Sequence, residues 1–321
     1  MAGTSQHNSG TSVASPLFLE RLLHASQKSR EGLTRLLVAT DFSMGADLAL
    51  ARALRLPVGE GASLTLFHAS RPVPGRGAPG DMSLEERCLK RAAGAARRRL
   101  RDREAVQVKL ELRAGDAAEE AAGVVRLQQV ELVVAGRPHA LHGQELSRRG
   151  ATVRDMVRRL DAPLLVVGGH PARAYQHPLV AVDLSEDSRR ALELALRLCP
   201  PPVKVDVLHV PEPCMSQGLW HAGMTSREHW LAVRQDIEVA ARKAVSHFLA
   251  PYREVGRECE ISIRCGEPLA EALLAEAAER GTDLLALGMD GSEEGLSRTG
   301  VVERMVMRAS CDVLVAKAHR L

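Results

Sequence analysis

The sequence predicts an α/β protein made of two doubly wound units joined end to end. Three observations support this: an internal repeat, short apolar runs with the composition of buried strands, and helical patterns between those runs. The chain has 321 residues, which is enough for two compact domains that each bury a core. Aromatic residues make up only 2% of it, so we expect cores of Val, Leu and Ala.

The repeat is seen first where residues 36–43 recur as residues 178–185, which matches Asp41 with Asp183. Four more segments recur in the same order, and five ordered matches are hard to explain by chance. The remaining pairs are 64–70 with 205–211, 108–121 with 260–273, 130–139 with 282–291, and 153–167 with 302–316.

The repeated segments contain strand and helix signals in alternation. Runs such as LLVA, LTLF, ELVVAG and PLLVVG are short and apolar throughout, which is typical of parallel strands covered on both faces. Residues 153–160 and 302–309 instead carry apolar residues at i, i+3, i+4 and i+7, which predicts helices. Alternating strands and helices predict mostly parallel sheets with right-handed crossovers. Ligand-binding loops should then gather where the strand order reverses.

The repeat divides the chain into domains at 33–170 and 177–321, preceded by an extension over 1–32 that we expect to be partly disordered. The extension has no signal-peptide pattern, and no apolar run is long enough for a membrane span, so we expect a cytoplasmic protein without a membrane partner. The six scattered cysteines predict reduced structural thiols. A net charge of +3 and few aromatic residues argue against a nucleic-acid partner.

Glycines mark the strongest local feature, because Gly288 and Gly291 follow an expected strand and Gly300 follows them. Glycine lets a backbone approach a phosphate closely, and the N-terminus of a helix near Gly300 would attract an anion. Such a motif alone is more often an ordinary turn.

The strand-end Asp41 and Asp183, the Gly-x-x-Gly loop and the closing segment VERMVMRASCDVLVA together resemble the universal stress protein family, in both halves of the chain. The resemblance implies a five-stranded parallel sheet with helices on both faces in each half. It also implies, from one branch of the family, an ATP site in the second half, with Mg²⁺ accompanying the nucleotide. Its residues would be Val182 and Asp183 at the adenosine and, around the phosphates, Gly288, Met289, Gly291, Gly300, Val301 and Val302.

The second-half loop departs from the family pattern. Eight residues, not nine, separate Gly291 from Gly300, and Val301 stands where the family has a hydroxyl. Acidic residues at 290, 293 and 294 would repel a triphosphate unless a metal intervenes. We therefore expect weak binding.

The first half departs further and forms a degenerate site of Asp41, Gly136 and Gly150. Its loop lacks the second glycine, and Pro138 removes a backbone donor. Arginines at 137, 148 and 149 could still attract an anion, but we expect a substitution at Gly136 to matter little for nucleotide binding.

Other candidates have simpler explanations. His68 and His209 follow apolar strands and are expected to be structural. The pair His139 and His142 has metal-compatible spacing but no adjacent third ligand. The basic segment 87–103 is flanked by acidic residues, which indicates a solvated helix face. The histidines and tryptophans at 220, 221, 229 and 230 predict a local packing patch.

The function predicted from these features is that of a cytoplasmic stress-response regulator whose second domain binds adenine nucleotide and acts on an unknown protein partner. The main alternative is a nucleotide-independent protein that uses the 211–230 region to bind a partner or a small apolar ligand. No catalytic set is evident, and slow ATP hydrolysis, with Asp290 orienting water, is a third alternative. Because family members often pair through their last strands, we expect 163–167 to lie against 312–316 in an internal pseudo-dimer, with pairing of two chains left open.

Overall fold

The structure, a computed structural model, describes Glu20 and residues 32–70, 83–101, 106–137, 146–169, 173–212, 222–223, 225–289 and 296–317. The expectation of partial disorder in the N-terminal extension falls almost wholly outside these residues.

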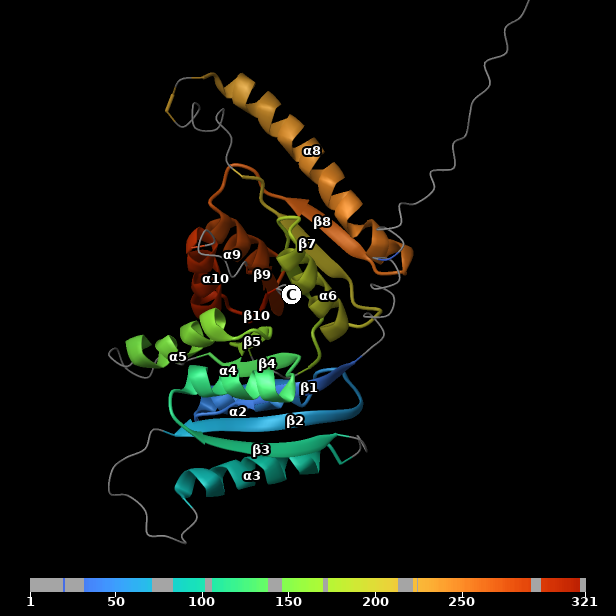
Figure 1. Cartoon of the computed structure of the whole chain (residues 1–321). Helices are drawn as coiled ribbons and strands as arrows, with labels where there is room; N and C mark the ends of the chain where they lie inside the picture. The colour runs from blue at the N-terminus through green and yellow to red at the C-terminus, as the bar shows by residue number, and fades with distance from the viewer. Residues whose placement is uncertain are drawn as a thin grey trace, which may run out of the picture.

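Strands and helices alternate through both halves as the sequence predicts (Figure 1). The first half contains β1 (Leu33–Ala39), α2 (Met44–Ala53), β2 (Val58–Ser70), α3 (Leu84–Arg99), β3 (Gln107–Ala114), α4 (Ala117–Gln128), β4 (Leu132–Gly136), α5 (Leu146–Arg159) and β5 (Leu164–Val167). The second half contains β6 (Pro178–Ala181), α6 (Glu186–Leu198), β7 (Val205–His209), α8 (Arg227–Glu254), β8 (Cys259–Ile263), α9 (Leu269–Glu279), β9 (Leu284–Gly288), α10 (Leu296–Arg308) and β10 (Asp312–Ala316).

The ten strands of the described residues form one sheet in the order β3-β2-β1-β4-β5-β10-β9-β6-β7-β8. Within each half the five strands are parallel, which confirms the predicted architecture. The halves meet through an antiparallel pair, β5 with β10, in which Leu165 lies opposite Leu314. The predicted internal pseudo-dimer is therefore present. Because the two sets of strands run in opposite directions, their carboxyl ends lie at opposite edges of the sheet.

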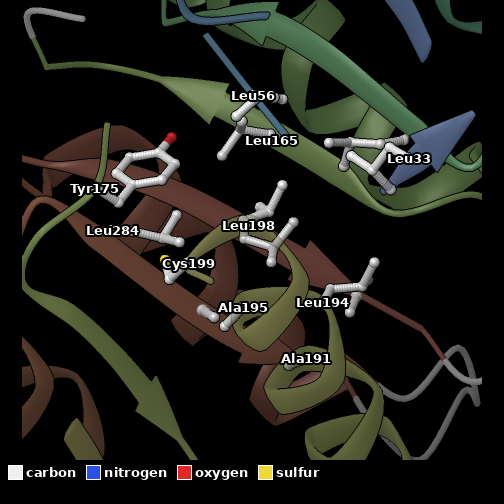
Figure 2. Packing of buried hydrophobic residues seen from close by; sticks show 14 of the residues in the cluster. Leu33, Leu56, Leu165, Tyr175, Ala191, Leu194, Ala195, Leu198, Cys199 and Leu284 are labelled. Atoms are coloured by element: carbon white, nitrogen blue, oxygen red, sulfur yellow. The ribbon is translucent and has the colours of Figure 1, made fainter. Parts of the chain in front are cut away.

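Helices cover the sheet in two layers. Alternate strand residues point to opposite faces, so in β5 Leu165 packs with α2 and α6, and Leu164 packs with α5 and α10. Each apolar cluster is continuous across both halves. Figure 2 shows part of one cluster, with Leu33, Leu56 and Leu165 from the first half and Leu194 and Leu198 from the second. Leu, Val and Ala dominate the buried residues, as expected from the shortage of aromatic residues.

A buried polar cluster centred on Asp312 joins the two halves. Asp312 is fully buried, and its Oδ2 accepts hydrogen bonds from Arg52 Nε at 2.7 Å and from the Tyr175 hydroxyl at 2.8 Å. Its Oδ1 accepts from the backbone N–H groups of Gly168 at 3.0 Å and Gly169 at 2.9 Å. Burial, followed by the negative charge of Asp312, raises the pKa of Tyr175. The carboxylate thus holds α2, β10 and the connection between the halves together.

This cluster is absent from the repeat pattern. The residue equivalent to Asp312 in the first half is Pro163, and the residue equivalent to Arg52 in the second half is Leu194. Pairing of two second halves would leave the Asp312 carboxylate without a partner, and pairing of two first halves would leave the Arg52 guanidinium without one. The ion pair therefore forms only when a first half pairs with a second half. Pairing of two first halves or of two second halves would bury an unpaired charge, which disfavours it.

A second polar contact between the halves centres on Glu131. Its carboxylate accepts hydrogen bonds from Thr34 Oγ1 at 2.7 Å and from Arg197 of α6 at 3.3 Å. Burial raises the pKa of Glu131, but the bonds from Thr34 and the charges of Arg197 and Arg35 outweigh it, so that the pKa is lowered. The ionised form is therefore the one that stabilises the fold.

Within the described ranges, no helix is long and apolar enough to cross a membrane. None of the five cysteines in those ranges forms a disulfide, in agreement with the predicted thiols.

Candidate functional site

The loop after β6 is a tight turn that precedes α6. Leu184 adopts a left-handed conformation with φ of 69°, which is uncommon for a residue other than glycine. Asp183 Oδ1 accepts the backbone N–H of Ser185 at 3.0 Å. The Ser185 hydroxyl in turn accepts the N–H of Ser188 at 3.2 Å and caps α6. The carboxylate of Asp183 is exposed at the edge of the sheet, so the turn presents it outward.

His209 fixes the backbone at the start of this loop. Its Nδ1 lies 2.7 Å from the carbonyl oxygen of Val182, which can only accept, so Nδ1 carries the proton. The N–H of Val182 donates to Leu208 O at 2.9 Å. The predicted structural role of His209 is thus confirmed, and so is that of His68, whose Nδ1 lies 2.7 Å from Thr40 O. Both backbone groups of Val182 already have partners, so the contact with a base that the resemblance implies would use the second lone pair of its carbonyl.

Gly288 ends β9 where the strand touches the first turn of α6. A Cβ atom there would lie 2.4 Å from Ser188 N and 2.5 Å from the carbonyl carbon of Asp187. Glycine is therefore required by strand–helix packing. This gives Gly288 a structural reason for being glycine, separate from the close approach of a phosphate that the sequence suggests.

The remaining second-half residues divide between core and surface. Met289 and Val302 are buried in the apolar cluster beneath α10, and Val301 packs against that cluster. Gly300 is exposed, and a Cβ on it would meet no atom within 4 Å. The helix α10 begins at Leu296, four residues earlier than expected, so Gly300 lies within its second turn. Gly291 and the acidic residues at 290, 293 and 294 lie outside the described residues.

The described part of this edge is acidic. The exposed Asp183 precedes Glu186 and Asp187, which lie in the first turn of α6. No cluster of three or more His, Cys, Asp or Glu residues that could hold a metal ion occurs among the residues that the structure describes.

The first half has the same turn after β1 that the second half has after β6, but the residues at the end of its β4 have different roles. Asp41 Oδ1 accepts the N–H of Ser43 at 3.0 Å, and Phe42 is left-handed with φ of 61°. A Cβ on Gly136 would lie 2.2 Å from the carbonyl carbon and oxygen of Gly45. Packing therefore requires glycine at 136, because a larger residue would push β4 away from α2. The expectation that a substitution there matters little for nucleotide binding stays a prediction. Gly150 lies inside α5.

The sequence suggests that Arg137 attracts an anion to the first half, but the structure gives its guanidinium other partners. Its guanidinium crosses to the second half, where Nη1 donates to Ala309 O, and Nη2 donates to Cys311 O at 2.8 Å. Sequence reasoning could not find this role, because the acceptors are backbone carbonyls more than 170 positions away. The only signal in the sequence is that an arginine stands where the second half has Met289. The side chains of Arg148 and Arg149 are outside the described part.

The other candidates stay untested or acquire structural roles. His139, His142, Trp220 and His221 lie outside the described residues. Trp230 is buried in the first turn of α8, while its neighbour His229 is exposed, so these two are not presented together.

Comparison with known proteins identifies relatives of the whole chain. The model of the universal stress protein family matches twice, over residues 32–168 and 174–317. The fold is similar to that of a universal stress protein from Archaeoglobus fulgidus DSM 4304, with 17% identity, a TM-score of 0.60, and coverage of 88% of this chain and 95% of that one. It is also similar to a functionally unknown protein from Pseudomonas aeruginosa PAO1, with 15% identity, a TM-score of 0.56, and coverage of 91% and 94%. No curated protein is significantly similar in sequence.

Proposed function

Because the chain belongs to the universal stress protein family, we propose that it is a stress-response regulatory protein that binds adenine nucleotide in its second half, without catalysis. The nucleotide would lie between the loop that follows β6 and the loop that follows β9. Asp183 would contact the adenosine, and the segment from Gly288 to Gly300 would surround the phosphates.

The observation that carries this proposal is the strand order. Neighbouring β6 and β9 run parallel, and the chain leaves them towards opposite faces, to α6 and α10. Ligands of doubly wound sheets bind at such a switch point, outside the carboxyl ends of the strands. Asp183 and Gly300 are both exposed beside this point. At the equivalent point of the first half, the loop that follows β4 sends Arg137 into the other half.

The test uses matched substitutions in the two halves, measured by calorimetry with Mg-ATP. Asp183→Ala and Asp41→Ala remove the same turn in each half, since both carboxylates accept a serine N–H at 3.0 Å. Gly300→Val and Gly123→Val each add a side chain to an exposed helical glycine with no atom within 4 Å. Each pair should therefore cost similar stability, which thermal unfolding would verify.

We expect only the second-half variants to weaken binding. Asp183→Ala should weaken it by about tenfold or more for the loss of one charged hydrogen bond, and Gly300→Val should weaken it because the added side chain would obstruct the approach of the phosphates. Loss of binding in Asp41→Ala alone would place the site in the first half. Absence of binding by the unmodified chain would refute the proposal.

A second candidate function is recognition of a partner or of a small apolar ligand, without nucleotide. The N-terminal part of α8 extends beyond the strands (Figure 1), and Leu231 and Val239 on it are 47% and 65% exposed. Native mass spectrometry of the purified protein distinguishes the candidates, because a co-purifying nucleotide favours the first and a bound lipid favours the second.

A further inference from the structure

The guanidinium of Arg137 has defined partners in the other half of the chain. Besides donating to Ala309 O and Cys311 O, its side chain lies against Gly168, where a Cβ atom would be 2.3 Å from Arg137 Cζ. A residue larger than glycine at 168 would therefore displace the guanidinium. Burial lowers the pKa of Arg137, although Cys311 and Asp312 oppose the shift, and the guanidinium keeps its charge.

The two carbonyls lie in the short connection from α10 to β10: Ala309 directly follows the last residue of the helix, and Cys311 directly precedes the strand. This helix ends at Arg308, and the N–H of Ala309 still bonds to Met305 O at 2.9 Å. The end of a helix carries partial negative charge and unsatisfied carbonyls, so a cation that donates hydrogen bonds there stabilises it. In the second half the equivalent of Arg137 is Met289, which is buried in the core. At this position of the repeat, the first half thus supplies a cation and the second half an apolar side chain.

A second contact from the first half reaches the middle of α10. Arg158 of α5 lies 2.7 Å from Glu303 of α10. The first half therefore contacts α10 at two points, through Arg137 beyond its carboxyl end and through Arg158 along its length.

The opposite end of α10 carries Gly300 and follows the loop proposed to surround the phosphates. We infer that Arg137 is a positioning residue for the second-half site: the degenerate loop of the first half holds α10 at its far end, so that its amino-terminal turns stay in place for the nucleotide. This inference rests on the proposed nucleotide site. A packed helix moves as a rigid element, so loss of the Arg137 hydrogen bonds near one end of α10 changes the position of its other end.

A reciprocal contact supports the idea that holding these helices is a feature of the interface. Lys317 follows β10, and its Nζ donates to the carbonyls of Arg158 at 3.0 Å and Leu160 at 3.1 Å, at the carboxyl end of α5. Its equivalent in the first half is Gly168, the residue that makes room for Arg137. Each half therefore sends one cation, from a different position in the repeat, to the end of the other half's last helix.

The test compares Arg137→Met, which keeps the apolar stem, and Arg137→Lys, which keeps the charge, with Arg126→Ala as a control. Arg126 pairs with Asp161 at 3.5 Å on the surface of the same half, with both side chains 64% exposed. Hydrogen exchange of the α10 amides and Mg-ATP affinity are measured on the full chain. We expect Arg137→Met to speed exchange along α10 and weaken ATP binding, each by about three- to tenfold, the upper range for a charge at a helix end. Arg137→Lys should recover part of both effects, and Arg126→Ala should change neither.

The outcomes separate the two proposals. If the unmodified chain binds ATP and Arg137→Met binds equally well, the positioning role is wrong, whether or not exchange changes, and the nucleotide site stands. If the unmodified chain does not bind ATP, the proposed function fails and the positioning role with it. Unchanged exchange in Arg137→Met would then also show that Arg137 does not hold α10.

Discussion

Replacing Asp312 with Asn is expected to destabilise the chain strongly, because four donors converge on this one carboxylate. Asn keeps the shape and can still accept from Gly168 and Gly169. Its amide nitrogen would then face Arg52 Nε, which lies 2.7 Å from the present Oδ2, so that two donors meet. The guanidinium, with its side chain only 5% exposed, would lose its counter-charge. Its stacking on Tyr175, 4.1 Å from the ring centroid, compensates only in part.

The magnitude follows from burial. Removing one partner of a buried ion pair costs about 3–5 kcal/mol, a large share of the roughly 5–15 kcal/mol that holds a typical domain folded. The exposed pair of Arg158 with Glu303, with side chains 58% and 17% exposed, provides the control. Arg158→Ala should cost about 1 kcal/mol or less.

Urea denaturation followed by circular dichroism measures both variants. The double variant Arg52→Met with Asp312→Leu should lose less than the two single losses combined, because it leaves no unpaired buried charge. If the free energy of unfolding of Asp312→Asn lies within about 1 kcal/mol of that of the unmodified chain, the cluster does not hold the halves together and the argument from burial fails.

Three further predictions concern packing, pH and strand pairing. Gly288→Ala and Gly136→Ala should each cost at least about 1–3 kcal/mol in urea denaturation, since a Cβ would meet helix backbone in both halves; unchanged stability would show that the strands can shift. Stability should fall as the pH drops below the ordinary Glu value of about 4.3 and through the lowered pKa of Glu131. Glu131→Gln should flatten that part of the pH profile of unfolding, and an identical profile would contradict the role of this carboxylate. Cysteines replacing Leu165 and Leu314 should form a disulfide within one chain, because these residues face each other in the ladder; a cross-linked dimer on a non-reducing gel would instead indicate pairing between chains.

The fold and its duplication could be predicted from the amino-acid sequence. Apolar runs such as Leu36–Val38 and the periodic residues of 153–160 carry strand and helix signals locally, and the five matched segments give their order twice. The pairing of 163–167 with 312–316 was also predictable, from a resemblance together with the need of an edge strand for a partner. Strands, helices and their order can be predicted because they depend on the pattern of residues that are close together in the sequence.

Tertiary structure alone decided what individual residues at the loops do. Gly288 and Gly136 look alike in sequence as phosphate-loop glycines, and only the approach of a helix backbone shows that packing requires both. Arg137 looked like an anion attractor, yet its partners are carbonyls of the other half. Asp312 appeared as one more strand residue. Each of these roles depends on atoms that are distant in the chain, and a sequence pattern carries no information about which backbone group a side chain will meet after two halves have packed together.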